Sequence, residues 1–259
     1  MPSALIGHTG FVGGNLAAQN QFDLFYNSKN IEEIAGRSVD LLVVSAMPAA
    51  MWIANREPEA DRAVLDRLAA SLRQVRAGRA VLISTTAVYP VPVDVDEESV
   101  IDPSAQTPYG RHRLMLEEIV KDHFSGAHVV RLPGLFGNGL KKNVIYDLLH
   151  NNEVHKINSA GVYQYYNLDH IWADLQTAMT SGLRLVNFVT SPVTVNEVAR
   201  EAFDLEFSND PGTAPAKSAI RSLHAARFGG RAGHLYDRSQ VLSELRAFVA
   251  REGARQLEH

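Results

Sequence analysis

Residues 4–13 read ALIGHTGFVG, and this stretch decides the fold of the chain. A short apolar run enters it, an amphipathic run leaves it, and Gly7, Gly10 and Gly13 lie between them with the spacing G-x-x-G-x-x-G. This spacing is typical of a first parallel strand that turns into a first helix around a dinucleotide pyrophosphate. The helix N-terminus adds free N–H groups and a partial positive charge. The predicted cofactor contacts here are Gly7, Thr9, Gly10, Phe11, Val12 and Gly13.

Apolar runs and helical patterns alternate over the first 130 residues. Residues 40–46 and 80–83 are near-continuous apolar runs, as expected for parallel strands covered on both faces. Residues 59–75 and 108–123 repeat apolar side chains at helical spacing, and the first of these repeats runs through Ala60, Val64, Leu68, Leu72 and Val75. The alternation predicts an α/β fold of Rossmann type, a doubly wound parallel sheet.

After residue 130 the pattern loosens, and helices are expected over residues 143–150, 171–179, 195–203 and 239–249. The sequence therefore predicts two parts. Residues 1–136 plus about 168–190 form a dinucleotide-binding domain, and about 137–167 plus 191–256 form a small C-terminal substrate-binding lobe. The last residues, 257–259, resemble the start of an expression tag.

The composition excludes several classes of protein. The net charge is only −4 and there is no cysteine, which argues against nucleic acid or an anionic membrane as a partner and excludes disulfides and thiolate chemistry. No segment reads as a signal peptide or a membrane span, so a cytoplasmic location is expected. The acidic residues between 94 and 98 lack metal-ligand spacing and are predicted to form a solvated surface, and no metal is expected.

The end of the second predicted strand bears on the choice of cofactor. Many NAD-binding folds place an acidic residue there to hold the adenosine ribose, whereas this chain has Asn27, Ser28 and Lys29. These donors suit a 2′-phosphate, so NADP is preferred and NAD is the second choice; an ordinary polar turn is the alternative interpretation. Ser45 and Ala46 end the next strand and are expected to border the cofactor.

Thr85, Tyr109 and Arg113 form a candidate catalytic group. Thr85 follows a strand, while Tyr109 and Arg113 lie four apart at the start of a helix and so share one face. A free tyrosine has a pKa near 10, and a fixed cation one turn away favours the phenolate. Such a tyrosine can move a proton on or off an alcohol while a hydride crosses to a nicotinamide. Taken alone, each of these residues is also common in ordinary helices and loops.

The chain resembles the extended short-chain dehydrogenases/reductases, in particular the NAD-dependent epimerase/dehydratase family that acts on sugar nucleotides. The resemblance covers essentially residues 3–250. Its motifs are residues 7–13, 84–89, 107–113, 131–139 and 167–170. It implies that Thr85 is the catalytic hydroxyl and that Tyr109 is the acid/base. It also implies that Pro133, Gly134 and Leu135 border the nicotinamide, and that the chain pairs as a homodimer through the helices of residues 59–75 and 108–123. The predicted substrate-binding residues are Asn143 and Arg231.

The departures from the family pattern narrow the reaction. Arg113 stands where the family has a lysine that binds the nicotinamide ribose. Thr86 and Ala87 stand where the related 4,6-dehydratases carry Asp-Glu, and the cysteine of the double epimerases is absent. Redox chemistry at one sugar carbon remains, either 4-epimerisation or 4-keto reduction, and the sequence leaves that choice open. The alternative is a catalytically silent NAD(P)-binding protein that serves as a sensor or partner subunit, a reading that Arg113 keeps open.

Overall fold

The computed structural model describes residues 2–257, so two residues of the predicted tag, 258 and 259, lie outside the described part. The chain divides into two compact units. The first unit comprises Met1–Val91, Glu98–Leu132 and Ile171–Asn187. The second unit comprises Pro92–Glu97, Pro133–His170 and Phe188–His259. Each unit is described by itself below.

The first unit is built on a six-stranded parallel sheet with the order β2-β1-β3-β4-β5-β9. Its strands are β1 (Ser3–Ile6), β2 (Leu24–Tyr26), β3 (Ser38–Val44), β4 (Arg76–Thr85), β5 (His128–Leu132) and β9 (Leu185–Asn187). The chain leaves β1 for β2 on one side and returns to β3 on the other, so Leu5 pairs with both Phe25 and Val43. This reversal is the switch point at which α/β sheets bind ligands. The predicted doubly wound parallel sheet is confirmed.

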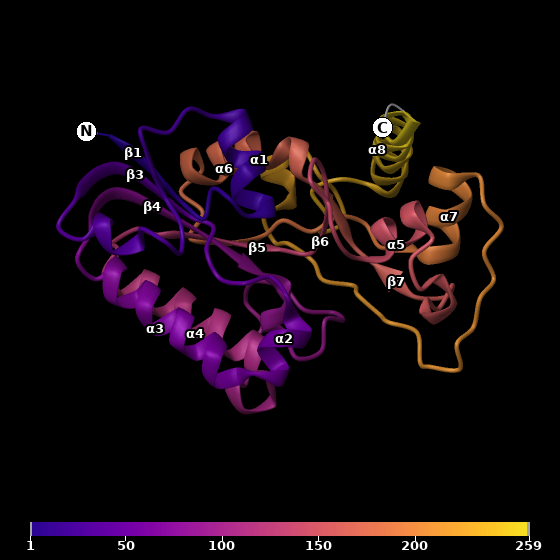
Figure 1. Ribbon diagram of the computed structural model, residues 1–259, viewed down its shortest axis with the longest axis horizontal. Helices are drawn as coiled ribbons and strands as arrows, with labels where there is room; N and C mark the ends of the chain where they lie inside the picture. The colour runs from indigo at the N-terminus through magenta and orange to yellow at the C-terminus, as the bar shows by residue number, and fades with distance from the viewer. Residues whose placement is uncertain (1, 258–259) are drawn as a thin grey trace. The chain divides into compact units, whose positions relative to one another are not determined.

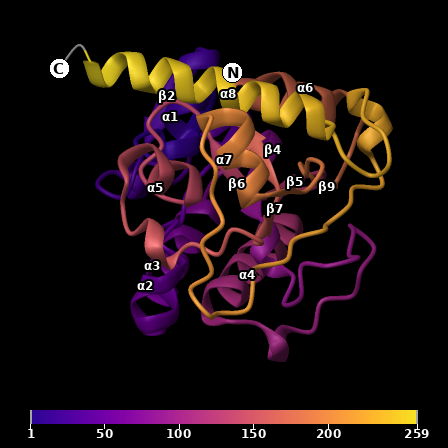
Figure 2. The same ribbon diagram turned by 90° about the vertical axis from the view of Figure 1, so that its right-hand side faces the viewer.

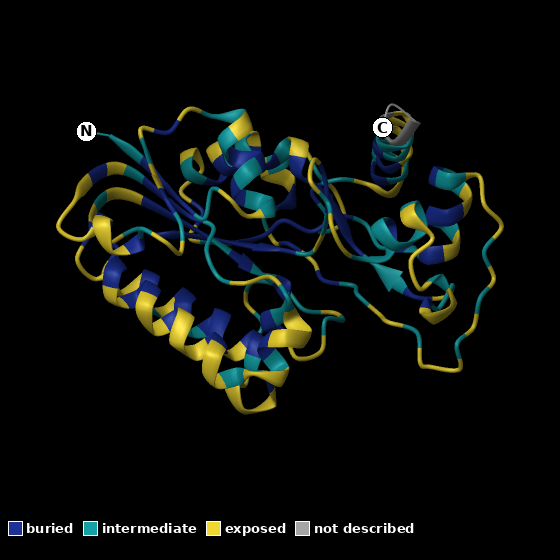
Figure 3. Cartoon of the chain, in the orientation of Figure 1, coloured by how far each residue is buried: buried dark blue, intermediate teal, exposed yellow. Residues whose placement is uncertain are grey.

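Helices cover both faces of this sheet (Figure 1). They are α1 (Phe11–Gln19) with α6 (Ile171–Thr180) on one face, and α3 (Pro58–Leu72) with α4 (Pro108–His123) on the other. Figure 3 shows that α3 and α4 each bury one stripe and expose the opposite one, while the strands between the layers are buried. Because the strands are covered on both faces, their sequences are near-continuously apolar.

The structure corrects two sequence predictions in the first unit. A short helix, α2 (Met51–Arg56), lies within the apolar stretch that follows β3, where no helix was predicted. The predicted inner face of α3 is also wrong at its first two positions, although Leu68, Leu72 and Val75 are buried as predicted. Ala60 is exposed and Val64 is 41% exposed, whereas Asp61 and Leu65 are buried. The buried carboxylate hid the true apolar stripe of α3.

The second unit has fewer helices and shorter strands than the first, and it has its own hydrophobic core. Its helices are α5 (Val144–His150), α7 (Val195–Phe203) and α8 (Arg238–Leu257), and its strands are β6 (Gly134–Phe136), β7 (Val162–Tyr163), β8 (Tyr165–Asn167) and β10 (Val193–Thr194). Strand β6 pairs parallel with β8, and β7 pairs antiparallel with β10. Helices α7 and α8 lie side by side (Figure 2) and bury Val198 and Leu245 in a core that includes Phe136. Helix α7 has the predicted bounds, while α8 is longer than predicted at both ends.

The acidic segment before residue 98 is only partly the solvated surface that the sequence suggested. Glu97 accepts hydrogen bonds from the Ser222 hydroxyl at 2.6 Å and from the Leu223 N–H at 2.8 Å, both within the second unit. It therefore ties two loops of that unit together. No described helix has the length and apolar character needed to cross a membrane.

Candidate functional site

The three glycines after β1 differ in why the chain needs them. Gly7 has a φ of +88°, and a Cβ there would lie 2.1 Å from the Ser45 carbonyl oxygen. A Cβ at Gly13 would lie 2.1 Å from the Gly7 carbonyl oxygen. Gly10 is exposed, has a φ of −82°, and its Cβ would meet only the Gly7 oxygen, at 3.3 Å. The fold thus requires Gly7 and Gly13. At Gly10, the missing side chain leaves open space on the solvent side of the loop.

Helix α1 begins at this loop with no side chain capping its N-terminus. Gly10 is its N-cap residue, and the Gly10 N–H donates to the Gly7 carbonyl at 2.9 Å. The first N–H groups of a helix lack intrahelical partners and carry a partial positive charge, so this end suits an anion such as a phosphate. The Ser45 N–H donates to the Ile6 carbonyl at 2.9 Å, which places the end of β3 against the loop. The predicted cofactor residues of segments 7–13 and 45–46 are therefore brought together.

The turn after β2 lies beside the same loop, since the Gly7 N–H donates to the Tyr26 carbonyl at 2.7 Å. Asn27 shapes this turn: its Oδ1 accepts from the Lys29 N–H at 2.8 Å. Ser28 and Lys29 are exposed, and no hydrogen bond or ion pair engages their side chains within the described part of the chain. The turn thus offers a hydroxyl and an ammonium group next to the glycine loop.

Tyr109 and Thr85 meet at the carboxyl end of β4. Helix α4 begins beside this end, and a Cβ on Gly110 would lie 2.6 Å from the Ala87 carbonyl oxygen, so the helix start approaches the turn after Thr85 closely. The Tyr109 N–H donates to Asn55 Oδ1 of α2 at 3.0 Å. The Thr85 hydroxyl accepts from the Ala87 N–H at 3.1 Å and hydrogen-bonds the Tyr109 phenol. The predicted threonine–tyrosine pair is therefore assembled within the first unit.

The guanidinium of Arg113 lies over the ring of Tyr109 and is hydrogen-bonded within the protein interior. Its guanidinium carbon is 3.8 Å from the ring centroid. The guanidinium forms a buried ion pair with Asp61 of α3 and donates to the carbonyls of Pro48 and Tyr109, the latter at 3.3 Å. The Nδ1 atom of His112 lies 2.7 Å from Asp61 Oδ2. Asp61 is the member of this site that the sequence analysis missed, and its signal was a carboxylate in line with Leu65 and Leu68 on the buried face of α3.

Burial raises the pKa of Tyr109 above its ordinary value of 10. The Arg113 charge and the Thr85 hydrogen bond lower this pKa, and the Asp61 charge raises it, but burial has the largest effect. The Arg113 cation does favour the phenolate, but burial of the ring outweighs its effect and keeps the pKa of Tyr109 raised.

The remaining predicted residues belong to the second unit. Pro133, Gly134 and Leu135 lead into and form β6. Asn143 is the N-cap of α5 and has a φ of +111°; its Oδ1 accepts from two N–H groups of α5, at 3.0 and 3.2 Å, and its amide donates to the Leu135 carbonyl at 2.8 Å. Arg231 is exposed in a bend closed by two backbone hydrogen bonds with His234. Asn143 and Leu135 are thus joined, whereas no described hydrogen bond links Arg231 to either.

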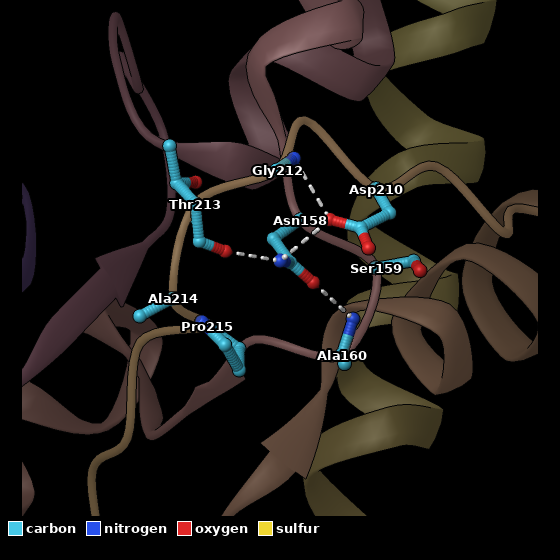
Figure 4. Close-up of a pocket in the computed structure, with 8 residues that line it drawn as sticks. All are labelled: Asn158, Ser159, Ala160, Asp210, Gly212, Thr213, Ala214 and Pro215. Atoms are coloured by element: carbon cyan, nitrogen blue, oxygen red, sulfur yellow. Dashed lines mark hydrogen bonds between the residues drawn. The ribbon is translucent and has the colours of Figure 1, made fainter.

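The second unit also contains a pocket of about 560 Å³ that none of the predicted site residues lines. Figure 4 shows that several of its lining residues are hydrogen-bonded to one another. Asn158 donates to the Thr213 carbonyl at 2.8 Å and accepts from the Ala160 N–H at 2.9 Å, and Asp210 accepts from the Gly212 N–H at 2.9 Å. Within residues 2–257 no cluster of three or more histidine and acidic side chains forms a metal site.

The parallel sheet with helices on both faces defines an α/β protein of Rossmann type. A sequence model described as "NAD dependent epimerase/dehydratase family" matches residues 20–159, more than half of the chain, so the chain belongs to that family. No curated protein matches the sequence.

Solved structures of low sequence identity share the fold. A UDP-glucose 4-epimerase from Thermotoga maritima, solved with UDP-glucose, has a TM-score of 0.75 at 17% identity and covers 100% of both chains. RMD from Pseudomonas aeruginosa, complexed with NADPH, has a TM-score of 0.74 at 15% identity and covers 98% of this chain and 100% of its own. A dTDP-4-dehydrorhamnose reductase from Clostridium acetobutylicum has a TM-score of 0.72 at 15% identity and covers 96% and 99%, respectively.

Proposed function

We propose that the chain is an NADPH-dependent reductase that converts a keto group of a sugar nucleotide to an alcohol. The observation that carries the proposal is the set of contacts around Tyr109. Its phenol is hydrogen-bonded to Thr85, and the cation on its ring, Arg113, is paired with the buried carboxylate of Asp61. A tyrosine in these surroundings meets its substrate as a neutral acid.

The protonation state of Tyr109 separates the two reactions that the sequence left open. A 4-epimerase begins by removing a proton from an alcohol, which requires a base. A ketoreductase ends by giving a proton to the oxygen of the former carbonyl, which requires an acid. Since burial holds the pKa of Tyr109 above 10, the phenol is suited to the second role. The Tyr109 proton goes to the substrate oxygen, the Thr85 hydroxyl hydrogen-bonds the same oxygen, and water returns a proton to the phenolate.

The residues of the first unit fit the cofactor that this reaction needs. The space at exposed Gly10 and the uncapped start of α1 suit a pyrophosphate, and Ser28 and Lys29 suit a 2′-phosphate. The bound nicotinamide supplies the hydride to the carbonyl carbon. Pro133, Gly134 and Leu135 are proposed to border the nicotinamide, and the second unit, with Asn143 and Arg231, is proposed to hold the substrate.

Family membership supports a sugar nucleotide as the substrate class, as do neighbours named as a UDP-glucose 4-epimerase and a dTDP-4-dehydrorhamnose reductase. Thr86 and Ala87 follow Thr85, so no carboxylate stands beside it to expel water in a dehydration. A reduction at a single carbon needs only the hydroxyls of Thr85 and Tyr109.

The test is a pair of assays on the purified protein. With NADPH and a 4-keto sugar nucleotide, we expect absorbance at 340 nm to fall as one alcohol forms per NADPH. With NAD⁺ and UDP-glucose, we expect no conversion to UDP-galactose. Epimer interconversion without net NADPH consumption would contradict the reductase and favour the epimerase.

The burial of Arg113 also supports a second candidate, a catalytically silent NAD(P)-binding protein. Arg113 is 4% exposed, and its guanidinium is held by Asp61 and by two backbone carbonyls. In this arrangement it is poorly placed to hold a ribose as the family lysine does. A protein that binds NADPH tightly and turns over neither class of substrate would be this silent relative.

Gly10→Val is expected to weaken NADPH binding at least tenfold, about 1.4 kcal/mol, because its side chain fills the space next to the uncapped start of α1. Isothermal titration calorimetry measures the change. Gly253→Val in α8, where a Cβ meets nothing within 4 Å, is the matched control and should bind NADPH as the wild type does. Unchanged affinity in Gly10→Val would show that the phosphates lie elsewhere.

Replacing both Ser28 and Lys29 with alanine is expected to reduce NADPH affinity by roughly ten- to a hundredfold, because charged hydrogen bonds to the 2′-phosphate contribute about 1.5–3 kcal/mol. NADH binding to the same variant is the internal control and should not change. Wild-type protein that binds NADH as tightly as NADPH would remove the basis for the preference.

A further inference from the structure

We propose that Asp61 is a positioning residue that holds the Arg113 guanidinium over the Tyr109 ring and balances its charge, and so limits how far that cation favours the phenolate. The effect of Asp61 on catalysis rests on the proposed function. The arrangement of Asp61, Arg113 and Tyr109 rests only on contacts within the first unit. Asp61 itself touches neither the phenol oxygen nor any group assigned to the substrate.

The orientation of Arg113 follows from where its donors go. One terminal nitrogen of the guanidinium donates to Asp61 and to the Tyr109 carbonyl, and the other donates to the Pro48 carbonyl. These partners come from α3, from α4 itself and from the segment after β3, so they fix the plane of the guanidinium from three directions. The guanidinium carbon lies 3.8 Å from the centroid of the Tyr109 ring. Without Asp61, a long arginine side chain has no other anchor on α3.

The surroundings of Asp61 indicate that its role is not simply to add stability. Its side chain is 3% exposed, and Asp61 is the charged residue on the buried face of α3. Oδ2 accepts from the Arg113 guanidinium and contacts Nδ1 of His112, while Oδ1 accepts no hydrogen bond from any described residue. A buried carboxylate with one unsatisfied oxygen lowers the stability of a protein. Proteins in which apolar residues of similar volume replace a buried ion pair are often equally stable or more stable. A carboxylate at this position is better explained by its effect on the arginine and the tyrosine beside it.

The charged and titratable groups around the phenol are few. Arg113 lies over the ring, Asp61 pairs with it, and His112 contacts Asp61; Thr85 of β4 adds an uncharged hydrogen bond. The Arg113 charge lowers the pKa of Tyr109 and the Asp61 charge raises it. Removing the Asp61 charge therefore leaves the cation unbalanced and makes the phenol a stronger acid.

The experiment is a pH titration of the Tyr109 phenol by NMR in protein labelled with ¹³C at the tyrosine Cζ. The chain has eight tyrosines, and loss of one resonance in Tyr109→Phe assigns the signal. In Asp61→Asn, which keeps the size of the side chain and one acceptor oxygen, we expect the midpoint of Tyr109 to fall by about 1 pH unit or more. In the pH profile of keto reduction, the fall of kcat on the alkaline side should begin at a correspondingly lower pH.

Two control variants separate this effect from general charge or histidine effects. Asp66→Asn removes a carboxylate from the same helix, but Asp66 is exposed and pairs with Arg62. The Tyr109 midpoint in this variant should therefore match that of the wild type. His112→Gln removes the neighbouring imidazole and should leave a Tyr109 titration that still responds to Asp61→Asn. A midpoint in Asp61→Asn within about 0.3 units of the wild type would overturn the proposal.

Two further outcomes are decisive. If Asp61→Asn does not fold, Asp61→Ser, which also removes the carboxylate and keeps Arg113, is titrated in its place. Its Tyr109 midpoint must also fall, and a wild-type midpoint would overturn the proposal. The titration needs no turnover. A shifted midpoint in a protein that reduces no substrate would therefore support the role of Asp61 and contradict the reductase. An active enzyme with an unshifted midpoint would support the reductase and contradict the role of Asp61.

Discussion

Replacing Tyr109 with phenylalanine is expected to lower the rate of NADPH-dependent keto reduction by about 10²–10⁴-fold, the usual contribution of a positioned acid or base. The substitution removes only the hydroxyl. The ring remains for the Arg113 guanidinium to lie on, and the Asp61 ion pair is untouched. The free energy of unfolding should therefore change by no more than about 1.5 kcal/mol, the value of the lost hydrogen bond to Thr85. Steady-state kinetics and urea unfolding measure the two effects.

Tyr26→Phe is the matched control for this variant. Tyr26 is a buried tyrosine of the same unit, 4% exposed, and its side chain packs in the apolar core. Its activity should stay within about twofold of the wild type. If Tyr109→Phe retains more than a tenth of the wild-type rate, the proton comes from another group and the assignment of Tyr109 is wrong.

Arg113→Lys then decides between the reductase and the silent protein. A reductase should keep or raise its rate, because lysine retains the charge and is the residue of the family pattern. A wild type without turnover, together with a gain of activity in Arg113→Lys, would establish the silent protein. In that case the buried pair with Asp61 would have removed from the site the cation that the chemistry needs.

The sequence was sufficient for the parts of the fold that depend on local pattern. The glycine spacing of residues 7–13 placed the turn between β1 and α1, because a tight turn and a close helix–sheet approach leave no room for a Cβ at Gly7 or Gly13. Helix α4 has the predicted bounds, since Thr107 caps it and Pro108 starts it. The spacing of Tyr109 and Arg113 also gave their shared helix face correctly.

The sequence was insufficient where a tertiary contact outweighs the local pattern. Helix α2 is only six residues long, and its exposed Met51 and Trp52 give no amphipathic period to detect. On α3, a buried aspartate interrupts the apolar stripe, so the pattern assigned Ala60 and Val64 to the inner face in place of the buried Asp61 and Leu65. The same aspartate opposes the effect of Arg113 on the pKa of Tyr109. The sequence could not show this, because a charge on α3 cannot be assigned to a partner on α4 without the packing of the two helices.

The largest expected loss of stability comes from Glu117→Ala. Glu117 is fully buried on α4 and accepts from Arg131 of β5 at 3.0 and 2.7 Å, and from the Ser84 hydroxyl of β4 at 2.6 Å. Arg131 also donates to the Tyr89 hydroxyl at 2.8 Å, and that hydroxyl bonds Asn187 of β9. The alanine variant leaves the Arg131 charge buried without its carboxylate. We expect the free energy of unfolding to fall by about 3–5 kcal/mol, a large part of the 5–15 kcal/mol typical of a domain.

Urea unfolding followed by tryptophan fluorescence measures this loss in the right part of the molecule, because both tryptophans of the chain, Trp52 and Trp172, lie in the first unit. Glu118→Ala, which removes the exposed neighbouring carboxylate, should change the unfolding free energy by less than about 0.5 kcal/mol. The double variant Glu117→Leu with Arg131→Met replaces the whole pair by apolar side chains and should be more stable than Glu117→Ala, since no unpaired charge is left behind. A double variant as unstable as the single one would mean that the loss comes from the packing around Glu117 rather than from the stranded arginine.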